Sequence, residues 1–260
     1  MKNYKIQPHR VLVEVCVDTL ASALAAEQGG ASRVELCSAL SEGGLTPSSG
    51  TIRIARILLS ISINVMIRPR TGNFLYSEAE FDVMLQDIEV ARQNRADGIV
   101  GGILLPDGTV DVLRTKEFVK AANPLPVTFH RAFDVATDPY KSLEDIIECG
   151  CVRILTSGQK ATAPEGSKLI AELVKQAGTR IIIMPGSGIN EKNAASLLSA
   201  TGAHEIHLSG RKPLPFGQRD GKPAEESTGF NTLYQTDAAI IRQVVHSVNS
   251  VCFSDEGERV

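Results

Sequence analysis

The stretch "VLVEVCVD" at residues 11–18 decides the fold, because its pattern of a short β-branched run leading into a helical segment returns along the chain. Later runs of the same kind occur at residues 33–37, 63–68, 98–104, 126–130, 152–157, 180–186 and 205–209. Amphipathic segments with the apolar spacing of one helical face lie between them. Strands that alternate with helices are typical of parallel sheets. Eight such units predict an α/β fold, a single (β/α)8 TIM-type barrel, rather than an open doubly wound sheet.

The chain has 260 residues, a length that α/β barrels commonly use as one domain. We therefore expect a single TIM-barrel domain over residues 1–260, with strands and helices between about residues 11 and 250 and a mobile tail over residues 254–260. Residues 211–236 are rich in proline, glycine and charge, which predicts a long loop that is either a solvated connector or a lid. Residues 237–250 predict a closing C-terminal helix.

The composition is that of a soluble globular protein, with 43% hydrophobic residues, 22% charged residues and a formal net charge of −3. Basic residues are scattered rather than gathered in runs, which argues against nucleic-acid binding. No segment has the apolar length of a membrane span or the apolar core of a signal peptide, so we expect a cytoplasmic protein without membrane contact. The five cysteines are an odd number, and we expect free thiols rather than a disulfide framework.

Charged and thiol side chains share the inward face of the predicted strands. Strand residues alternate between faces, so Glu14 lies on the face of Cys16, and Glu35 on the face of Cys37. The apolar alternates, which we expect to face the surrounding helices, are Val13, Val15, Val34 and Leu36. The same rule points further side chains into the barrel: Met66, Arg68, Thr128, His130, Arg153, Leu155, Glu205, His207 and Ser209. The sequence therefore predicts an unusually ionic barrel interior.

Charges of both signs at the carboxyl ends of strands are costly to bury and indicate a functional site. An alternative is that Glu35 and Arg68 form one buried structural pair and that His130 is a hydrogen-bonded core residue. We expect Glu35 to be buried with Arg68 as its nearest cationic partner, and Glu42 to lie near the rim of the site.

Two cysteines are candidate metal ligands. Neighbouring parallel strands lie about 4.8 Å apart, so Cys16 and Cys37 at equivalent strand ends would bring two sulfurs to one soft metal. Two thiolates suit Cu(I). The alternative is that both are small buried apolar side chains.

Glycine-rich strand ends predict an anion site. The segments "MPGSGI" at residues 184–189 and "HLSGRK" at residues 207–212 end the seventh and eighth strands, where many barrels hold phosphate. The candidate anion-binding residues are Gly186, Gly188, Ser209 and Gly210.

Six motifs in matching order resemble the copper homeostasis protein family CutC, over nearly the whole chain to about residue 210. They are "EVCVD", "RVELCSALSEGGLTPS", "MIRPRTGNFLYS", "VTFHRAFDV", "RILTSG" and "IMPGSGI". The resemblance implies a TIM-type barrel, a cytosolic location, a homodimer or homotetramer, and a copper homeostasis role with Cu(I) on Cys16 and Cys37; no organic cofactor is implied. The family pattern "MIRPRGGDF" is "MIRPRTGNF" here, so Asn73 replaces a carboxylate.

A copper carrier has no evident use for seven further charged residues around the barrel mouth, which look like those of an enzyme: Glu14, Glu35, Arg68, Arg70, His130, Arg131 and Asp134. In this second hypothesis His130 and one of the two glutamates are general acid and base, and Arg68 and Arg70 hold a small anionic or phosphorylated metabolite. Lyase, isomerase and hydrolase chemistry all remain open. A third hypothesis, a non-catalytic scaffold, predicts an exposed apolar patch that the sequence does not indicate.

Overall fold

The computed structural model describes residues 11–214 and 233–251. The predicted tail at residues 254–260 and the middle of the predicted loop at residues 211–236 lie outside these residues.

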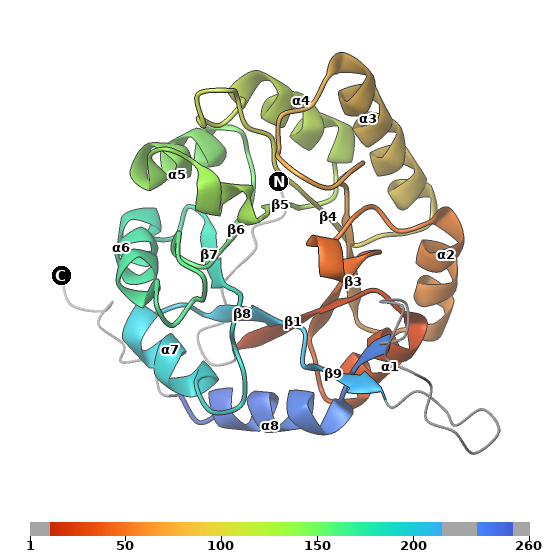
Figure 1. The fold of residues 1–260 in the computed structure, drawn as a ribbon, viewed down its shortest axis with the longest axis vertical. Helices are drawn as coiled ribbons and strands as arrows, with labels where there is room; N and C mark the ends of the chain where they lie inside the picture. The colour runs from red at the N-terminus through yellow and green to blue at the C-terminus, as the bar shows by residue number, and fades with distance from the viewer. Residues whose placement is uncertain (1–10, 215–232, 252–260) are drawn as a thin grey trace, which may run out of the picture.

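Eight parallel strands form a barrel, which confirms the predicted fold (Figure 1). The strands are β1 Leu12–Val17, β2 Arg33–Leu36, β3 Ser62–Met66, β4 Gly98–Gly101, β5 Val127–Phe129, β6 Arg153–Thr156, β7 Ile182–Pro185 and β8 Glu205–Leu208. Consecutive strands are neighbours from β1 to β7, and β8 lies next to β1. A parallel bridge between Gly186 and His207 joins the ends of β7 and β8 and closes the barrel.

A ring of helices surrounds the strands. They are α1 Leu20–Gln28, α2 Ser49–Leu58, α3 Glu78–Gln93, α4 Val112–Ala122, α5 Pro139–Glu148, α6 Ser167–Ala177, α7 Ala194–Thr201 and α8 Ala238–Val248. Side chains cap many helix starts, as where Ser77 and Glu80 form a reciprocal capping box that satisfies two backbone amides of α3. Among the described residues, no helix combines the length and the apolar character that crossing a bilayer requires.

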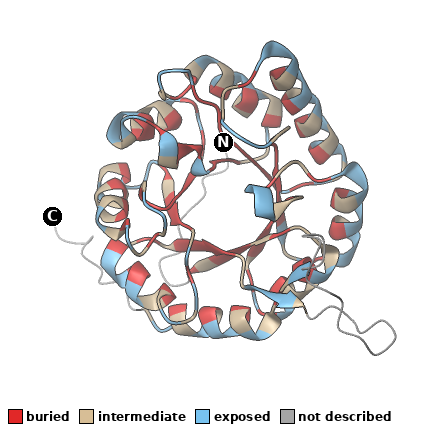
Figure 2. Ribbon diagram, in the orientation of Figure 1, coloured by how far each residue is buried: buried red, intermediate tan, exposed pale blue. Residues whose placement is uncertain are grey.

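The core lies between the strands and this ring. Figure 2 shows buried residues along the strands and on the helix sides that face them. The predicted outward positions are at most 1% exposed and belong to this core, which confirms the alternation: Val13, Val15, Val34 and Leu36. The other face of each strand is therefore free to carry polar groups into the barrel.

The segment predicted as a long loop has regular structure at both ends. Strands β9 Arg211–Leu214 and β10 Leu233–Thr236 pair antiparallel beside the barrel. Thr236 anchors the pair, because its amide donates to Ser22 Oγ at 3.1 Å and its hydroxyl donates to the Ser209 carbonyl at 3.0 Å. The prediction of a loop was therefore wrong for these two four-residue ends.

The predicted closing helix is α8. Its Ile241 is fully buried against Gly29 at the end of α1. A Cβ on Gly29 would come within 2.5 Å of the Ile241 side chain, so only glycine permits this approach between α1 and α8.

Candidate functional site

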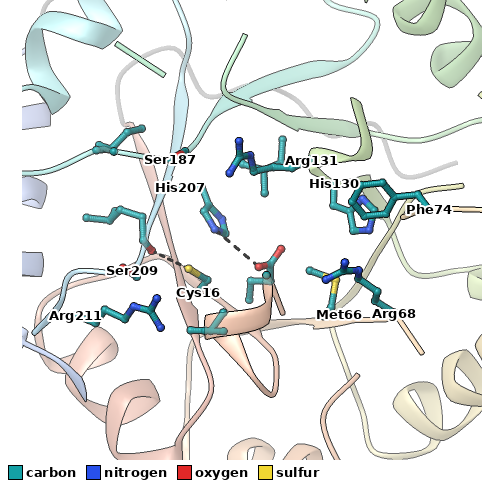
Figure 3. Close-up of a pocket in the computed structure, with 17 residues that line it drawn as sticks. Cys16, Met66, Arg68, Phe74, His130, Arg131, Ser187, His207, Ser209 and Arg211 are labelled. Carbon is teal, nitrogen blue, oxygen red and sulfur yellow. Dashed lines mark hydrogen bonds and ion pairs between the residues drawn. The ribbon is translucent and has the colours of Figure 1, made fainter. Parts of the chain in front are cut away.

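A cavity of about 390 Å³ opens at the carboxyl ends of the strands, and we call it the mouth cavity. It lies where barrel proteins of this kind place their sites. Figure 3 shows ten labelled residues that line it: Cys16, Met66, Arg68, Phe74, His130, Arg131, Ser187, His207, Ser209 and Arg211. Glu35 and Gly188 also line it. Many of the side chains predicted to point inward thus meet in one space.

Three neighbouring strands bring a thiol, a carboxylate and an imidazole together. Strand β1 lies between β2 and β8, and its Cys16 is paired in register with Glu35 of β2. One donor atom each from Cys16, Glu35 and His207 lie within 4.8 Å of one another. We call these three residues the Cys16 cluster, and its spacing suits a metal ion. The sequence placed Glu35 and His207 inside the barrel but indicated neither as a partner of Cys16.

Cys37 is buried, does not line the mouth cavity and is not paired in register with Cys16. The register pairs Cys16 with Glu35, so the two cysteines are not at equivalent strand ends as expected. The Cys37 thiol lies 3.5 Å from Glu35 Oε2 and packs with Met66 and Val100. Burial and the Glu35 carboxylate raise the pKa of the Cys37 thiol. Glu35 is therefore the group that connects both cysteines.

Glu35 itself is a buried carboxyl with an incomplete set of partners. Burial, and to a lesser degree the charge on Glu14, raise its pKa to about 6, although His207 acts in the opposite direction. His207 Nε2 lies 3.8 Å from Glu35 Oε2, and Glu35 Oε1 has no hydrogen-bond partner among the described residues. A buried acceptor without a partner is costly and indicates room for a ligand or ion.

A buried layer of ion pairs lies beneath the cavity and holds His207. Its members are Glu14, Arg33, Arg153 and Glu205. Glu14 accepts from His207 Nδ1 at 2.8 Å and from Asn64 Nδ2 at 3.1 Å, and it pairs with Arg33. The hydrogen bond from His207 Nδ1 fixes the ring so that Nε2 faces the other two members of the Cys16 cluster, Cys16 and Glu35.

The charges of this ion-pair layer keep its groups ionised. Burial alone would raise the pKa of Glu14, but Arg33, His207 and Arg153 outweigh it and hold that pKa well below its usual range. The pKa of His207 is raised, because Cys16, Glu35 and Glu14 outweigh the burial that disfavours its charged form. Glu14, a predicted catalytic residue, is fully buried in this layer and does not line the mouth cavity.

The predicted pair between Glu35 and Arg68 is wrong. The Arg68 guanidinium instead donates to the carbonyls of Glu42 at 2.9 Å, Gly44 at 3.2 Å and Gly72 at 2.8 Å. It also lies 5.1 Å from the centre of the Phe74 ring. Arg68 follows the end of β3, where two loops surround it, and their backbone carbonyls take the place of the carboxylate.

The remaining predicted catalytic residues separate into two groups. Arg70 pairs with Glu80 at 2.5 Å and does not line the mouth cavity. Arg131 lines it and pairs with Asp134 at 2.7 Å. Asp134 also accepts from the Ser157 amide and hydroxyl, so it is occupied in holding the loops after β5 and β6.

His130 is a buried, neutral histidine with one free ring nitrogen. Its Nδ1 accepts from the Ala132 amide at 3.2 Å, and its Nε2 has no hydrogen-bond partner among the described residues. Burial and the neighbouring Arg68 charge lower its pKa to about 3. The ring therefore offers an N–H donor to the cavity.

Replacing His130 by asparagine is expected to make the free energy of unfolding less dependent on pH in acid. The His130 ring has a pKa of 6.5 in the unfolded chain and of about 3 in the folded protein. The stability that the neutral ring contributes is therefore complete above pH 6.5 and is lost as the pH falls toward 3. The loss is about 1.4 kcal/mol per pH unit, or about 2 kcal/mol at pH 5. Asparagine retains an oxygen for the Ala132 amide. Urea unfolding at pH 7 and pH 5 measures the effect, and equal pH dependence in both proteins would contradict it.

The predicted anion-binding glycines have packing roles. A Cβ on Gly186 would meet the Leu155 side chain at 2.5 Å, and one on Gly210 would meet Ile241 at 2.4 Å. Of the four candidates, Gly188 and Ser209 line the mouth cavity, and Gly186 and Gly210 do not. Anion binding by these residues stays a prediction.

Fold and site together define a TIM-barrel protein with a thiol, imidazole and carboxylate cluster at the mouth of the barrel. The sequence profile of the CutC family matches residues 11–212. A family protein CutC from Chromobacterium violaceum is 52% identical over 208 residues, which cover 80% of this chain and 84% of that protein. One from Bacteroides fragilis is 44% identical over 257 residues, covering 98% of this chain and all of that protein. The chain therefore belongs to the CutC family.

Solved structures agree with this assignment. The putative copper homeostasis protein CutC from Streptococcus agalactiae is 37% identical, with a TM-score of 0.74, and the match covers 76% of this chain and 98% of that one. Phosphoribosylanthranilate isomerase from Thermotoga maritima has a TM-score of 0.55 at 13% identity, covering 92% of this chain and 98% of that one. The latter likeness shows the barrel fold alone.

Proposed function

We propose that this CutC family member acts in copper homeostasis by binding Cu(I) at the barrel mouth through Cys16 and Cys37, with His207 as a third ligand. The observation that carries the proposal is the Cys16 cluster, whose donor atoms lie within 4.8 Å of one another, with the Cys37 thiol 3.5 Å from Glu35. A relative from Streptococcus agalactiae is named as a putative copper homeostasis protein.

The donor set fits a soft metal. Thiolates and imidazole are preferred ligands of Cu(I), whereas a site for magnesium or calcium would present mainly oxygen atoms. Glu35 Oε1 has no hydrogen-bond partner among the described residues, which leaves room beside it for a bound ion or ligand. Because the raised pKa of Cys37 keeps that thiol protonated at neutral pH, metal binding there must release a proton.

Anaerobic titration of the reduced protein against a chromophoric Cu(I) chelator tests the proposal. It supports copper binding if one equivalent of Cu(I) leaves the chelator and if prior alkylation of the thiols prevents this. Retention of all the copper by a weak chelator would overturn it.

A second function is favoured by the mouth cavity itself. We propose, as the alternative, an enzyme that acts on a small anionic metabolite. The supporting observation is a cavity of about 390 Å³ lined by Arg68, Arg131 and Arg211 together with two histidines. His207, held by Glu14 at 2.8 Å, replaces His130 as the better acid–base candidate, because His130 is held neutral far below neutral pH. A screen of metabolites for turnover tests this alternative, and absence of any turnover would count against it.

We also propose a cytoplasmic location and a homo-oligomer. The cysteines of the described residues, Cys16, Cys37, Cys149 and Cys151, are all free thiols, as a reducing compartment would keep them. The side chains of Ile54, Ile57 and Leu58 leave an apolar stretch exposed on α2, which self-association would cover. Light scattering that finds only monomers at micromolar concentration would overturn the oligomer.

A further inference from the structure

Unpartnered polar atoms concentrate around the mouth cavity. Five buried side-chain nitrogen or oxygen atoms lack a hydrogen-bond partner among the described residues, and three belong to residues that line this cavity. These three are Glu35 Oε1, Arg68 Nε and His130 Nε2. Two are donors and one is an acceptor, so the cavity presents a polar pattern that a ligand would complete.

Arg68 is also a buried cation without a counter-ion. It is 5% exposed, and its guanidinium makes hydrogen bonds to three neutral carbonyls but pairs with no carboxylate among the described residues. An unpaired buried charge is expensive, which makes an anion from outside the chain a favourable partner.

Of the other two arginines of the cavity, one is paired with a carboxylate and the other is exposed to solvent. Arg131 pairs with Asp134 at 2.7 Å. Arg211 is exposed on β9, and its guanidinium lies 5.2 Å from the centre of the Tyr234 ring. One uncompensated buried positive charge therefore remains, and it matches a singly charged carboxylate better than a doubly charged phosphate.

The acceptor lies apart from the donors along the cavity. Figure 3 shows Arg68, His130 and Phe74 together on one side, with Cys16 and His207 on the other. Glu35 belongs with Cys16 and His207, and its free oxygen can accept a hydrogen bond from a ligand hydroxyl. A carboxylate at one end and a hydroxyl at the other would satisfy both sides.

We propose that the mouth cavity binds a small hydroxycarboxylate, with its carboxylate on Arg68 and His130 and its hydroxyl directed to Glu35. This inference deepens the second proposed function by naming its substrate class, and it does not depend on copper. The cavity volume of about 390 Å³ lies within the range of small-molecule sites.

Calorimetric titration of the reduced, copper-free protein tests this binding with matched probes. 4-Hydroxybutyrate and butyrate differ only by the terminal hydroxyl, and inorganic phosphate supplies a doubly charged anion without a carboxylate. 4-Hydroxybutyrate is expected to bind saturably and several-fold more tightly than butyrate or phosphate. No saturable binding of 4-hydroxybutyrate, or tighter binding of phosphate, would overturn the proposal.

Variants locate the carboxylate. Arg68→Gln is expected to weaken 4-hydroxybutyrate binding roughly 10- to 100-fold, because a hydrogen-bonded charge is lost. Arg70→Gln is the control, since Arg70 does not line the cavity, and it should bind 4-hydroxybutyrate as the parent does. His130→Asn gives a second variant in case Arg68→Gln does not fold, with an expected loss of roughly fivefold. Equal affinity in His130→Asn and the parent would overturn the assignment of the donor.

The same titrations separate this inference from the enzyme proposal. 4-Hydroxybutyrate binding that depends on Arg68, without turnover of any hydroxycarboxylate, supports the binding site and counts against the enzyme. Turnover of a metabolite without a carboxylate, in a protein that does not bind 4-hydroxybutyrate, supports the enzyme and overturns this inference.

Discussion

Replacement of Arg33 by methionine is expected to lower the free energy of unfolding by about 3–5 kcal/mol. Arg33 is 8% exposed, and its guanidinium pairs with Glu14 and, at 2.6 Å, with Glu205. Burial of an ion pair contributes little net stability, but removal of one partner from a buried layer is costly. Without Arg33, and among the described residues, Glu205 keeps only Arg153, and Glu14 keeps only the hydrogen bonds from His207 and Asn64. Methionine fills much of the volume of the arginine side chain, so the change isolates the charge.

Urea unfolding followed by circular dichroism at pH 7 measures this loss. Arg180→Met is the matched control, because Arg180 pairs with Glu144 on the surface, where water screens the pair. The unfolding midpoint of this variant should stay close to that of the parent. The double variant Arg33→Met with Glu14→Gln should recover part of the loss, since it removes one of the two carboxylates with which Arg33 pairs. An Arg33→Met midpoint equal to that of the parent would show that the layer is not energetically coupled.

The fold followed from a local pattern. Eight β-branched runs, each leading into a helical segment, predicted the barrel, and the alternation along each run predicted which side chains face the helices. Val15 and Val34 are fully buried in that outer core, as expected. These features depend on strand geometry within a few residues, which a single sequence records directly.

The partnerships inside the barrel depended on register between strands, which no local pattern records. The alternation placed Cys16, Glu35 and His207 inward, but only the β1–β2 register sets Cys16 opposite Glu35 instead of Cys37. Arg33 was missed as an inward residue, although it lies two positions before Glu35 and the same alternation indicates it. Extending the alternation by one residue at the start of that run would have found it.

Loop conformation determined the partners of Arg68. The sequence suggested a carboxylate on the neighbouring strand, whereas the loop containing Gly43 and Gly44 closes over the guanidinium with its carbonyls. Both glycines have positive φ values, 86° and 85°, which bring backbone oxygens where side chains were expected. Such backbone turns are not encoded in charge or hydrophobic periodicity, so the uncompensated charge of Arg68 became visible only in the structure.

Loss of both candidate thiolates is expected to weaken Cu(I) binding roughly 10⁴-fold. Structural metal sites with four ligands bind with about 10–16 kcal/mol, so two ligands account for roughly half of that free energy. The variant is Cys16→Ala with Cys37→Ser, and anaerobic competition with a chromophoric Cu(I) chelator measures its affinity. Cys149→Ala with Cys151→Ala is the control, because these two thiols are buried at the amino end of β6, away from the mouth cavity.

The single variants test the geometry of the site. Cys16 lines the mouth cavity and lies with His207 and Glu35 in one cluster. Cys37 is buried next to Glu35, does not line the cavity and has a raised thiol pKa. Binding through Cys37 must therefore displace a proton, which lowers its contribution at neutral pH. Cys16→Ala is expected to cost more affinity than Cys37→Ser, and the difference should shrink as the pH rises and the Cys37 proton is lost more readily. If the double variant competes for Cu(I) as well as the parent does, neither cysteine is a ligand and the copper site lies elsewhere.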